Sequence, residues 1–260
     1  MLLPTMTLDE LYRAVQNDRQ FIDRKLDESV KACGRVALKS QIFPLSRKYT
    51  YTHPKSKIEY SYYIQCYKRS SWRNPKCVTM ASYSHSEGIT TFNIGLGDNT
   101  MIVITSHFWQ RFHERYIKND AYTIQDTIDF FARNMGVVNL VNGVVRSDER
   151  YFIDDDTTFI AGVCPLGVLY CEQYKSNPNI IVLNTYLSLE MLRKQQNNKI
   201  AMQYLAAYVD DYKDRRLADA ASLENESTEL DARAMMEHWS MDQWITESEK
   251  LMDKYPLFAI

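Results

Sequence analysis

One short segment, in which a strand-like run passes directly into an amphipathic helix, constrains this chain more than any other. The apolar run from Met101 to Ile104 precedes it. At about 100° per residue, one narrow side of such a helix carries His107, Arg111, Glu114 and Lys118, with Arg115 at its edge. The aromatic side chains of the neighbouring arc are Phe108, Trp109, Phe112 and Tyr116. An imidazole, a guanidinium and a carboxylate on one side of an aromatic-anchored helix make this segment the best candidate for chemistry.

Composition sets broad bounds on the class of protein. The chain has 260 residues, of which 45% are hydrophobic, enough for one domain with embellishments or for two small ones. It has no apolar run of about 18 residues, so we expect no membrane partner. The start of the sequence lacks the pattern of a secretory signal. Five cysteines without a CxxC pair indicate reduced thiols and a cytoplasmic location.

Charge is unevenly distributed along the chain. The net charge is −2, yet the segment from Gln41 to Lys76 carries eight basic residues and one acidic residue. The segment from Asp210 to Asp231 carries eight acidic and three basic residues. Such asymmetry marks either a polyanion-facing side opposed to an acidic side, or merely solvated loops and helix faces.

The order of the predicted elements indicates an α+β fold. Thr7 and Glu10 form a capping box that opens a helix running to about Ala32, with Gly34 just past its end. Period-two alternation predicts a half-buried strand from Ile58 to Tyr67. Further strands are predicted at 76–83, 89–94 and 100–104, with a hairpin turn at 95–99.

In the second half of the chain, predicted strands again follow a predicted helix. Thr123 caps a second helix that ends at Gly136. Short strands are predicted at 150–153, 158–163, 167–174 and 180–186, and helices follow from Ser188 to the end. The expected regions are an N-terminal helix with an antiparallel β section (1–100), two helices with a curved antiparallel sheet (101–196) and a C-terminal helical extension (197–260), or all of these in one compact domain.

The section from about residue 102 to 195 resembles the nuclease fold group shared by barnase, EndoU, RelE-like and tRNA-cutting colicin domains. The resemblance rests on a helix with His107, Arg111 and Arg115 in an HxxxRxxxR pattern, a second helix, and strands that close on Thr185 and Tyr186. It covers about a third of the chain.

The resemblance implies metal-independent RNA cleavage, in which the 2′-hydroxyl attacks the adjacent phosphorus. His107 would transfer a proton, since its ordinary pKa lies near neutrality. Arg111 and Arg115 would hold phosphate oxygens, Thr185 would donate a hydrogen bond to one, and Tyr186 would stack on a base. No cofactor and no metal are expected, and a role as toxin or defence effector fits the family.

Ordinary structural roles remain open for each of these residues. His107 also suits a helix cap, Arg111 and Arg115 suit surface ion pairs, and Thr185 and Tyr186 suit any strand. His113 falls on a different face from His107, so the pair does not predict a metal site.

A second set of residues bears on RNA. The segment from Tyr67 to Lys76 interleaves cations with aromatic side chains, which suits backbone contact and base stacking as well as it suits a plain basic turn. Its candidate substrate-binding residues are Lys68, Arg69, Trp72 and Arg73.

Three functions therefore compete. The first is an endoribonuclease, which would also have a protein inhibitor as partner. The second is a non-catalytic protein-interaction module, for which Trp239 and Trp244 are candidate anchors. The third is a nucleic-acid-binding protein without catalysis.

Overall fold

The computed structural model describes residues 5–95, 99–134, 139–143, 159–164 and 166–187. Two compact units make up the chain. The first is built mainly from Met1–Arg133 and Tyr170–Tyr186, and the second from Asn134–Leu169 and Leu187–Ala259. The division into regions 1–100, 101–196 and 197–260 stays a prediction.

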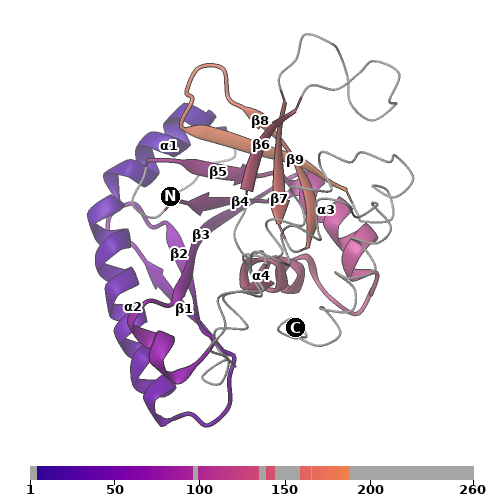
Figure 1. Cartoon of the computed structure of the whole chain (residues 1–260). Coiled ribbons are helices and arrows are strands. Elements are labelled where there is room, and N and C mark those ends of the chain that lie inside the picture. The colour runs from indigo at the N-terminus through magenta and orange to yellow at the C-terminus, as the bar shows by residue number, and fades with distance from the viewer. Residues whose placement is uncertain (1–4, 96–98, 135–138, 144–158, 165, 188–260) are drawn as a thin grey trace. The chain divides into compact units, whose positions relative to one another are not determined.

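Helices and a mainly antiparallel sheet make up the fold, which confirms the α+β class (Figure 1). The first unit carries the strand order β1-β2-β3-β4-β5-β9-β8. The strands are β1 (Leu45–Thr52), β2 (Glu59–Cys66), β3 (Lys76–His85), β4 (Gly88–Ile94), β5 (Met101–Ile104), β8 (Gly167–Gln173) and β9 (Ile180–Leu187). Strands β1 to β5 form an antiparallel meander. Strand β9 joins β5 in parallel, with Met101 opposite Ile180, so the sheet is mixed where the sequence predicted an antiparallel one.

Two helices, α1 (Leu8–Asn17) and α2 (Arg19–Lys39), replace the single predicted N-terminal helix. The Thr7–Glu10 capping box is confirmed. The prediction that the helix ends before Gly34 is wrong, because α2 continues to Lys39. The break falls instead at Asp18, whose buried carboxylate accepts hydrogen bonds from Ser56 and Tyr60.

Helices cover both faces of the meander. Helices α1 and α2 pack on one face, where Tyr60, Tyr62 and Ile64 of β2 enter the core. Helix α4 (Ile124–Asn134) contacts the other face, because Tyr63 donates to Asp129 and Gln65 donates to the carbonyl oxygen of Arg133. Strand β2 is therefore buried on both sides, and the prediction of a half-buried strand is wrong.

Short helical segments complete the first unit. They are η1, a 3₁₀ turn (Arg69–Arg73), α3 (Ser106–Phe112) and η2, a π-helical turn (His113–Ile117). None of the described helices is long and apolar enough to cross a membrane.

The described part of the second unit contains an antiparallel pair, β6 (Asn139–Gly143) with β7 (Phe159–Cys164). Strand β7 matches the strand predicted at 158–163, whereas β6 was not predicted. The predicted strand at 150–153, Gly136 and the helices from Ser188 onward lie outside the described residues.

Candidate functional site

Helix α3 is fixed by its aromatic side chains. Phe108, Trp109 and Phe112 are fully buried. Their rings lie edge-on to Phe131 of α4, at centroid distances of 5.5, 5.3 and 5.1 Å respectively. The prediction that this arc of the helix faces a core is confirmed.

His107 lies in the first turn of α3 with its side chain exposed. Thr105, rather than His107, caps the helix: its Oγ1 accepts a hydrogen bond from the Phe108 N–H at 3.2 Å and donates to the Leu183 carbonyl at 3.1 Å. In the part of the chain that the structure describes, His107 makes no hydrogen bond or ion pair. The imidazole is therefore accessible.

Arg111 is engaged on the surface of the same helix. Its Nη1 donates to Glu114 Oε2 at 2.9 Å, and the two side chains are 40% and 57% exposed. This is the surface ion pair that the sequence left open as an alternative. Such a pair contributes little to stability and can exchange with another anion.

The π-helical turn changes where Arg115 points. The Lys118 N–H donates to the His113 carbonyl at 2.9 Å, a five-residue spacing that widens the turn. Positions after Phe112 therefore leave the regular stripe read from the sequence. The guanidinium of Arg115 donates to the main-chain carbonyl of Tyr186.

Tyr186 belongs to the core. It is 1% exposed, and its ring lies edge-on to Phe112 at 4.9 Å. The ring is thus enclosed by aromatic neighbours where the sequence predicted an exposed stacking surface. Thr185 is partly buried beside it on β9. The structure brings Arg115 to the end of β9, but within the described residues it records no contact that joins His107, Arg111 and Thr185.

His113 faces away from His107, toward α4. Its Nδ1 lies 2.7 Å from Thr127 Oγ1. Over the described ranges, no three His, Cys, Asp or Glu side chains gather as a metal site would require.

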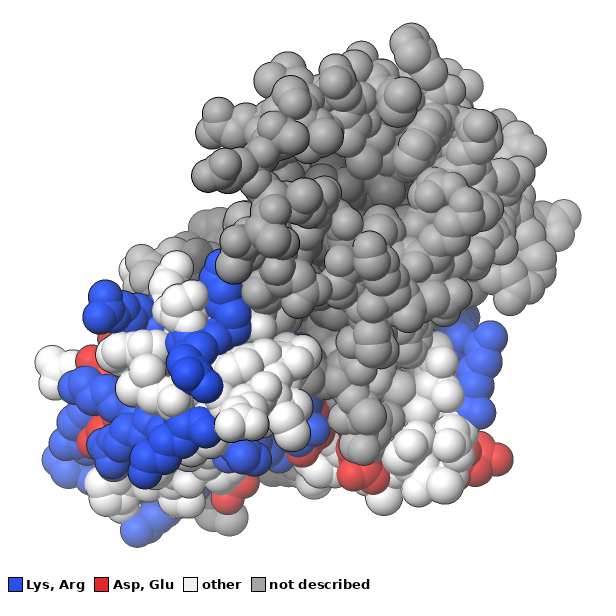
Figure 2. All heavy atoms as spheres, turned by 60° about the horizontal axis from the view of Figure 1, so that its bottom comes forward, with Lys and Arg blue, Asp and Glu red and all other residues white. Residues whose placement is uncertain are grey.

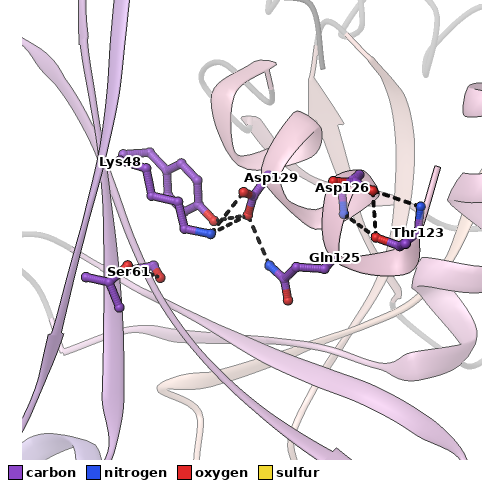
Figure 3. Close-up of polar contacts among 8 residues, drawn as sticks. Lys48, Ser61, Thr123, Gln125, Asp126 and Asp129 are labelled. Atoms are coloured by element: carbon purple, nitrogen blue, oxygen red, sulfur yellow. Dashed lines mark hydrogen bonds and ion pairs between the residues drawn. The ribbon is translucent and has the colours of Figure 1, made fainter.

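Lys48 belongs to the basic segment from Gln41 to Lys76, but in the structure the carboxylate of Asp129 neutralises its charge (Figure 3). Its Nζ donates to both carboxylate oxygens of Asp129, at 2.8 and 2.9 Å. The same carboxylate accepts from Tyr63 at 2.7 Å and from Gln125 at 3.0 Å. Burial, followed by the hydrogen bond to Asp129, raises the pKa of Tyr63. We interpret this cluster as the polar anchor of α4 on β1 and β2.

Other cations remain exposed, and we call them the basic face. Its members are Lys31, Arg35 and Lys39 of α2, Arg47 of β1, and Arg69 and Arg73 of η1. Within the described residues none of the six forms an ion pair. On the face drawn in Figure 2, Lys and Arg side chains form a cluster at the lower left, and a second group lies at the right edge.

Trp72 fixes η1 against α2 and so assembles the basic face. Gly34 leaves room for the indole, because a Cβ at this position would lie 2.9 Å from the Trp72 ring. Arg69 Nη2 donates to the Ser40 carbonyl at 2.9 Å, just beyond the last turn of α2. The Arg73 guanidinium lies 5.5 Å from the centroid of the Trp72 ring.

The sequence predicted only part of this face. Arg69, Trp72 and Arg73 were candidates, and Lys68 also lies here, where its main-chain N–H donates to Ser71 Oγ at 3.1 Å and opens η1. The cations of α2 were missed. The sequence does contain a pattern that could have revealed the cations of α2. Basic residues recur every fourth position from Lys31 to Lys39, and no acidic residue occurs from Ser29 to Ile58.

No family model, no curated protein and no solved structure matches this chain.

Proposed function

We propose that this protein binds RNA through the basic face. The observation that carries the proposal is the set of six exposed cations from three elements that form no ion pair in the described part of the chain. A cation that forms no ion pair within the protein can neutralise a phosphate and release the counterion condensed on it. The overall charge of −2 does not oppose this, because screening limits the reach of distant acidic groups to roughly 10 Å.

Salt dependence tests this proposal most directly. Fluorescence anisotropy of the full chain with a labelled RNA hairpin is measured over a series of KCl concentrations. If each of the six cations contacts one phosphate, the logarithm of the association constant falls with the logarithm of salt with a slope of about −4 to −5. An affinity that does not weaken with salt contradicts the proposal.

Charge reversal locates the binding surface. The triple variant Arg35→Glu, Lys39→Glu and Arg69→Glu should weaken binding by at least about 100-fold, since it replaces three attractive contacts with repulsive ones. The matched control reverses Arg13, Arg24 and Lys55 to Glu, exposed cations away from η1 and the C-terminal end of α2. Equal losses in the two triple variants would contradict a localised face.

Cleavage of the bound RNA is a second candidate, and the exposure of His107 favours it. In this reaction the 2′-oxygen bonds to phosphorus while the bond to the 5′-oxygen breaks. His107 takes the proton of the 2′-hydroxyl, and a second group gives one to the 5′-oxygen. Arg111 would exchange Glu114 for a phosphate oxygen.

Cleavage is tested with total RNA in the presence of EDTA. Activity should generate 2′,3′-cyclic phosphate ends and fall at least about 100-fold in His107→Ala. Unchanged cleavage after His107→Ala and Arg111→Ala together would contradict the site assignment. The protein-interaction role, the second of the three functions, predicts an oligomer or a co-purifying partner. A monomer by light scattering with no co-purifying protein would contradict it.

A further inference from the structure

Large aliphatic side chains are exposed beside the basic face. In the described part of the chain these are Val36, Leu38 and Ile42, which are 36%, 49% and 81% exposed. All three lie at the C-terminal end of α2 or in the turn that follows it. A water-exposed apolar group is common, but three together at one end of a helix suggest a ligand with apolar surfaces.

These side chains lie among the cations. On α2, Leu38 is seven residues from Lys31 and three from Arg35, so the three share one side of the helix. Ile42 is held in place by Ser40, whose Oγ accepts from the Ile42 N–H at 3.1 Å and donates to its carbonyl at 2.8 Å. The Ser40 carbonyl in turn accepts from Arg69.

Aromatic rings accompany the cations on the neighbouring hairpin. Trp72 and Tyr67 are both partly buried. The Arg73 guanidinium lies 5.5 Å from the Trp72 ring, and Lys76 Nζ lies 6.0 Å from the Tyr67 ring. Cationic and apolar groups thus alternate on both α2 and the η1 hairpin.

We infer that the basic face takes single-stranded RNA in preference to duplex RNA, an inference that rests on the proposed function. The cations contact phosphates, while the exposed side chains of Leu38 and Ile42 contact unstacked bases. In a duplex the bases are paired and stacked inside, so the exposed aliphatic groups would face only sugars, phosphates and water.

The arrangement of the charges favours a single strand over an anionic lipid surface. Successive cations of α2 are four residues apart, a rise of about 6 Å. Along the helix, Leu38 lies between Arg35 and Lys39, so the apolar group is not segregated from the charges. A single strand alternates charge and apolar ring at each nucleotide, whereas a bilayer holds its charges in one layer and its apolar groups in a deeper one.

The test compares an unstructured RNA strand with a perfect duplex of the same length and sequence, at one salt concentration, by anisotropy with the full chain. We expect the single strand to bind at least about tenfold more tightly. Leu38→Ser with Ile42→Ser should remove about tenfold of that affinity without changing the salt slope or the duplex affinity. Ile42→Leu, which keeps the apolar group, should bind like the unmodified chain.

The outcomes separate the two proposals. Equal or tighter binding of the duplex overturns this inference and leaves RNA binding intact. Failure of every RNA to bind overturns the proposed function. Binding to vesicles of anionic phospholipid that is lost in the Leu38→Ser, Ile42→Ser variant, with RNA affinity unchanged, overturns the inference in favour of a membrane surface.

Discussion

Two regions of the first unit carry cations at helical spacing, and they differ in what those cations contact. In the region from α3 to η2, Arg111 is bound to Glu114, and Arg115 is bound to a main-chain carbonyl. On the basic face, Lys31, Arg35 and Lys39 have no ion-pair partner within the described residues. Spacing along the sequence therefore predicts which side of a helix a charge occupies, but not whether the charge is available to a ligand.

The largest expected effect is a loss of folding stability in the α3 region, where buried aromatic rings, and not the polar stripe of His107, hold the helix. Trp109→Ala removes a fully buried ring packed on Phe108 and Phe131 and should lower the free energy of unfolding by about 4 kcal/mol. Urea denaturation followed by circular dichroism measures it. His107→Ala is the control, with a change below about 0.5 kcal/mol because the side chain is exposed. A large loss from His107→Ala would mean that His107 is structural.

A smaller effect is expected at the anchor of α4. Asp129→Ala leaves the Lys48 ammonium and the Tyr63 hydroxyl without their carboxylate and should cost about 2 kcal/mol of unfolding free energy, since the pair is only partly buried. Gln125→Ala, which removes one neutral donor to the same carboxylate, should cost about 0.5 kcal/mol. Equal costs for the two variants in chemical denaturation would show that the ion pair adds nothing.

Gly34→Ala tests how the basic face is assembled. Alanine favours the helix by about 1 kcal/mol, but its Cβ would force the Trp72 ring to move, so we expect a net loss of about 1 kcal/mol and weaker RNA binding. In the background of Trp72→Ala, the same substitution should instead stabilise the chain, because the obstructing ring is gone. A loss of stability that persists in the double variant would contradict this role of Gly34.

The smallest effect is a pH dependence at the start of α4. The Thr123 hydroxyl and then its main-chain N–H donate to Asp126 and lower the pKa of that carboxyl. The stabilisation is fully present above the carboxyl's ordinary pKa near 4, and it is lost as the pH falls through the lower folded-state value. Thermal midpoints measured from pH 6 to pH 2 should fall less steeply in Asp126→Asn than in the unmodified chain. Parallel curves would contradict the assignment.

Local signals in the sequence predicted much of the fold. The capping boxes at Thr7 and Thr123 and the strands β2 to β5 follow from side-chain chemistry within a few residues. Strand β1 was missed because Arg47 and Lys48 interrupt its apolar pattern, and Lys48 finds its partner Asp129 only in three dimensions. The break at Asp18 likewise depends on Ser56 and Tyr60, which lie far along the chain.

The candidate site was harder to predict than the fold. The helical-wheel prediction for His107 to Arg115 assumes a regular α-helix. The π-helical turn after Phe112 changes the angle between successive side chains, so the predicted stripe does not continue past that residue. The burial of Tyr186 depends on rings from α3 that no local pattern links to β9. The basic face combines α2 with η1 through a contact between Trp72 and Gly34, which are distant in sequence.

The parallel pairing of β5 with β9 has a consequence for how the chain folds. Strands β1 to β5 meet through short connections, so their contacts can form early, even while the rest of the chain is being synthesised. Met101 cannot meet Ile180 until the long segment between them has been made and its ends have closed, which costs chain entropy before any contact compensates for it. Until then the outer edge of β5 offers unpaired main-chain groups, and this edge is where chaperone capture or misassembly between copies would begin.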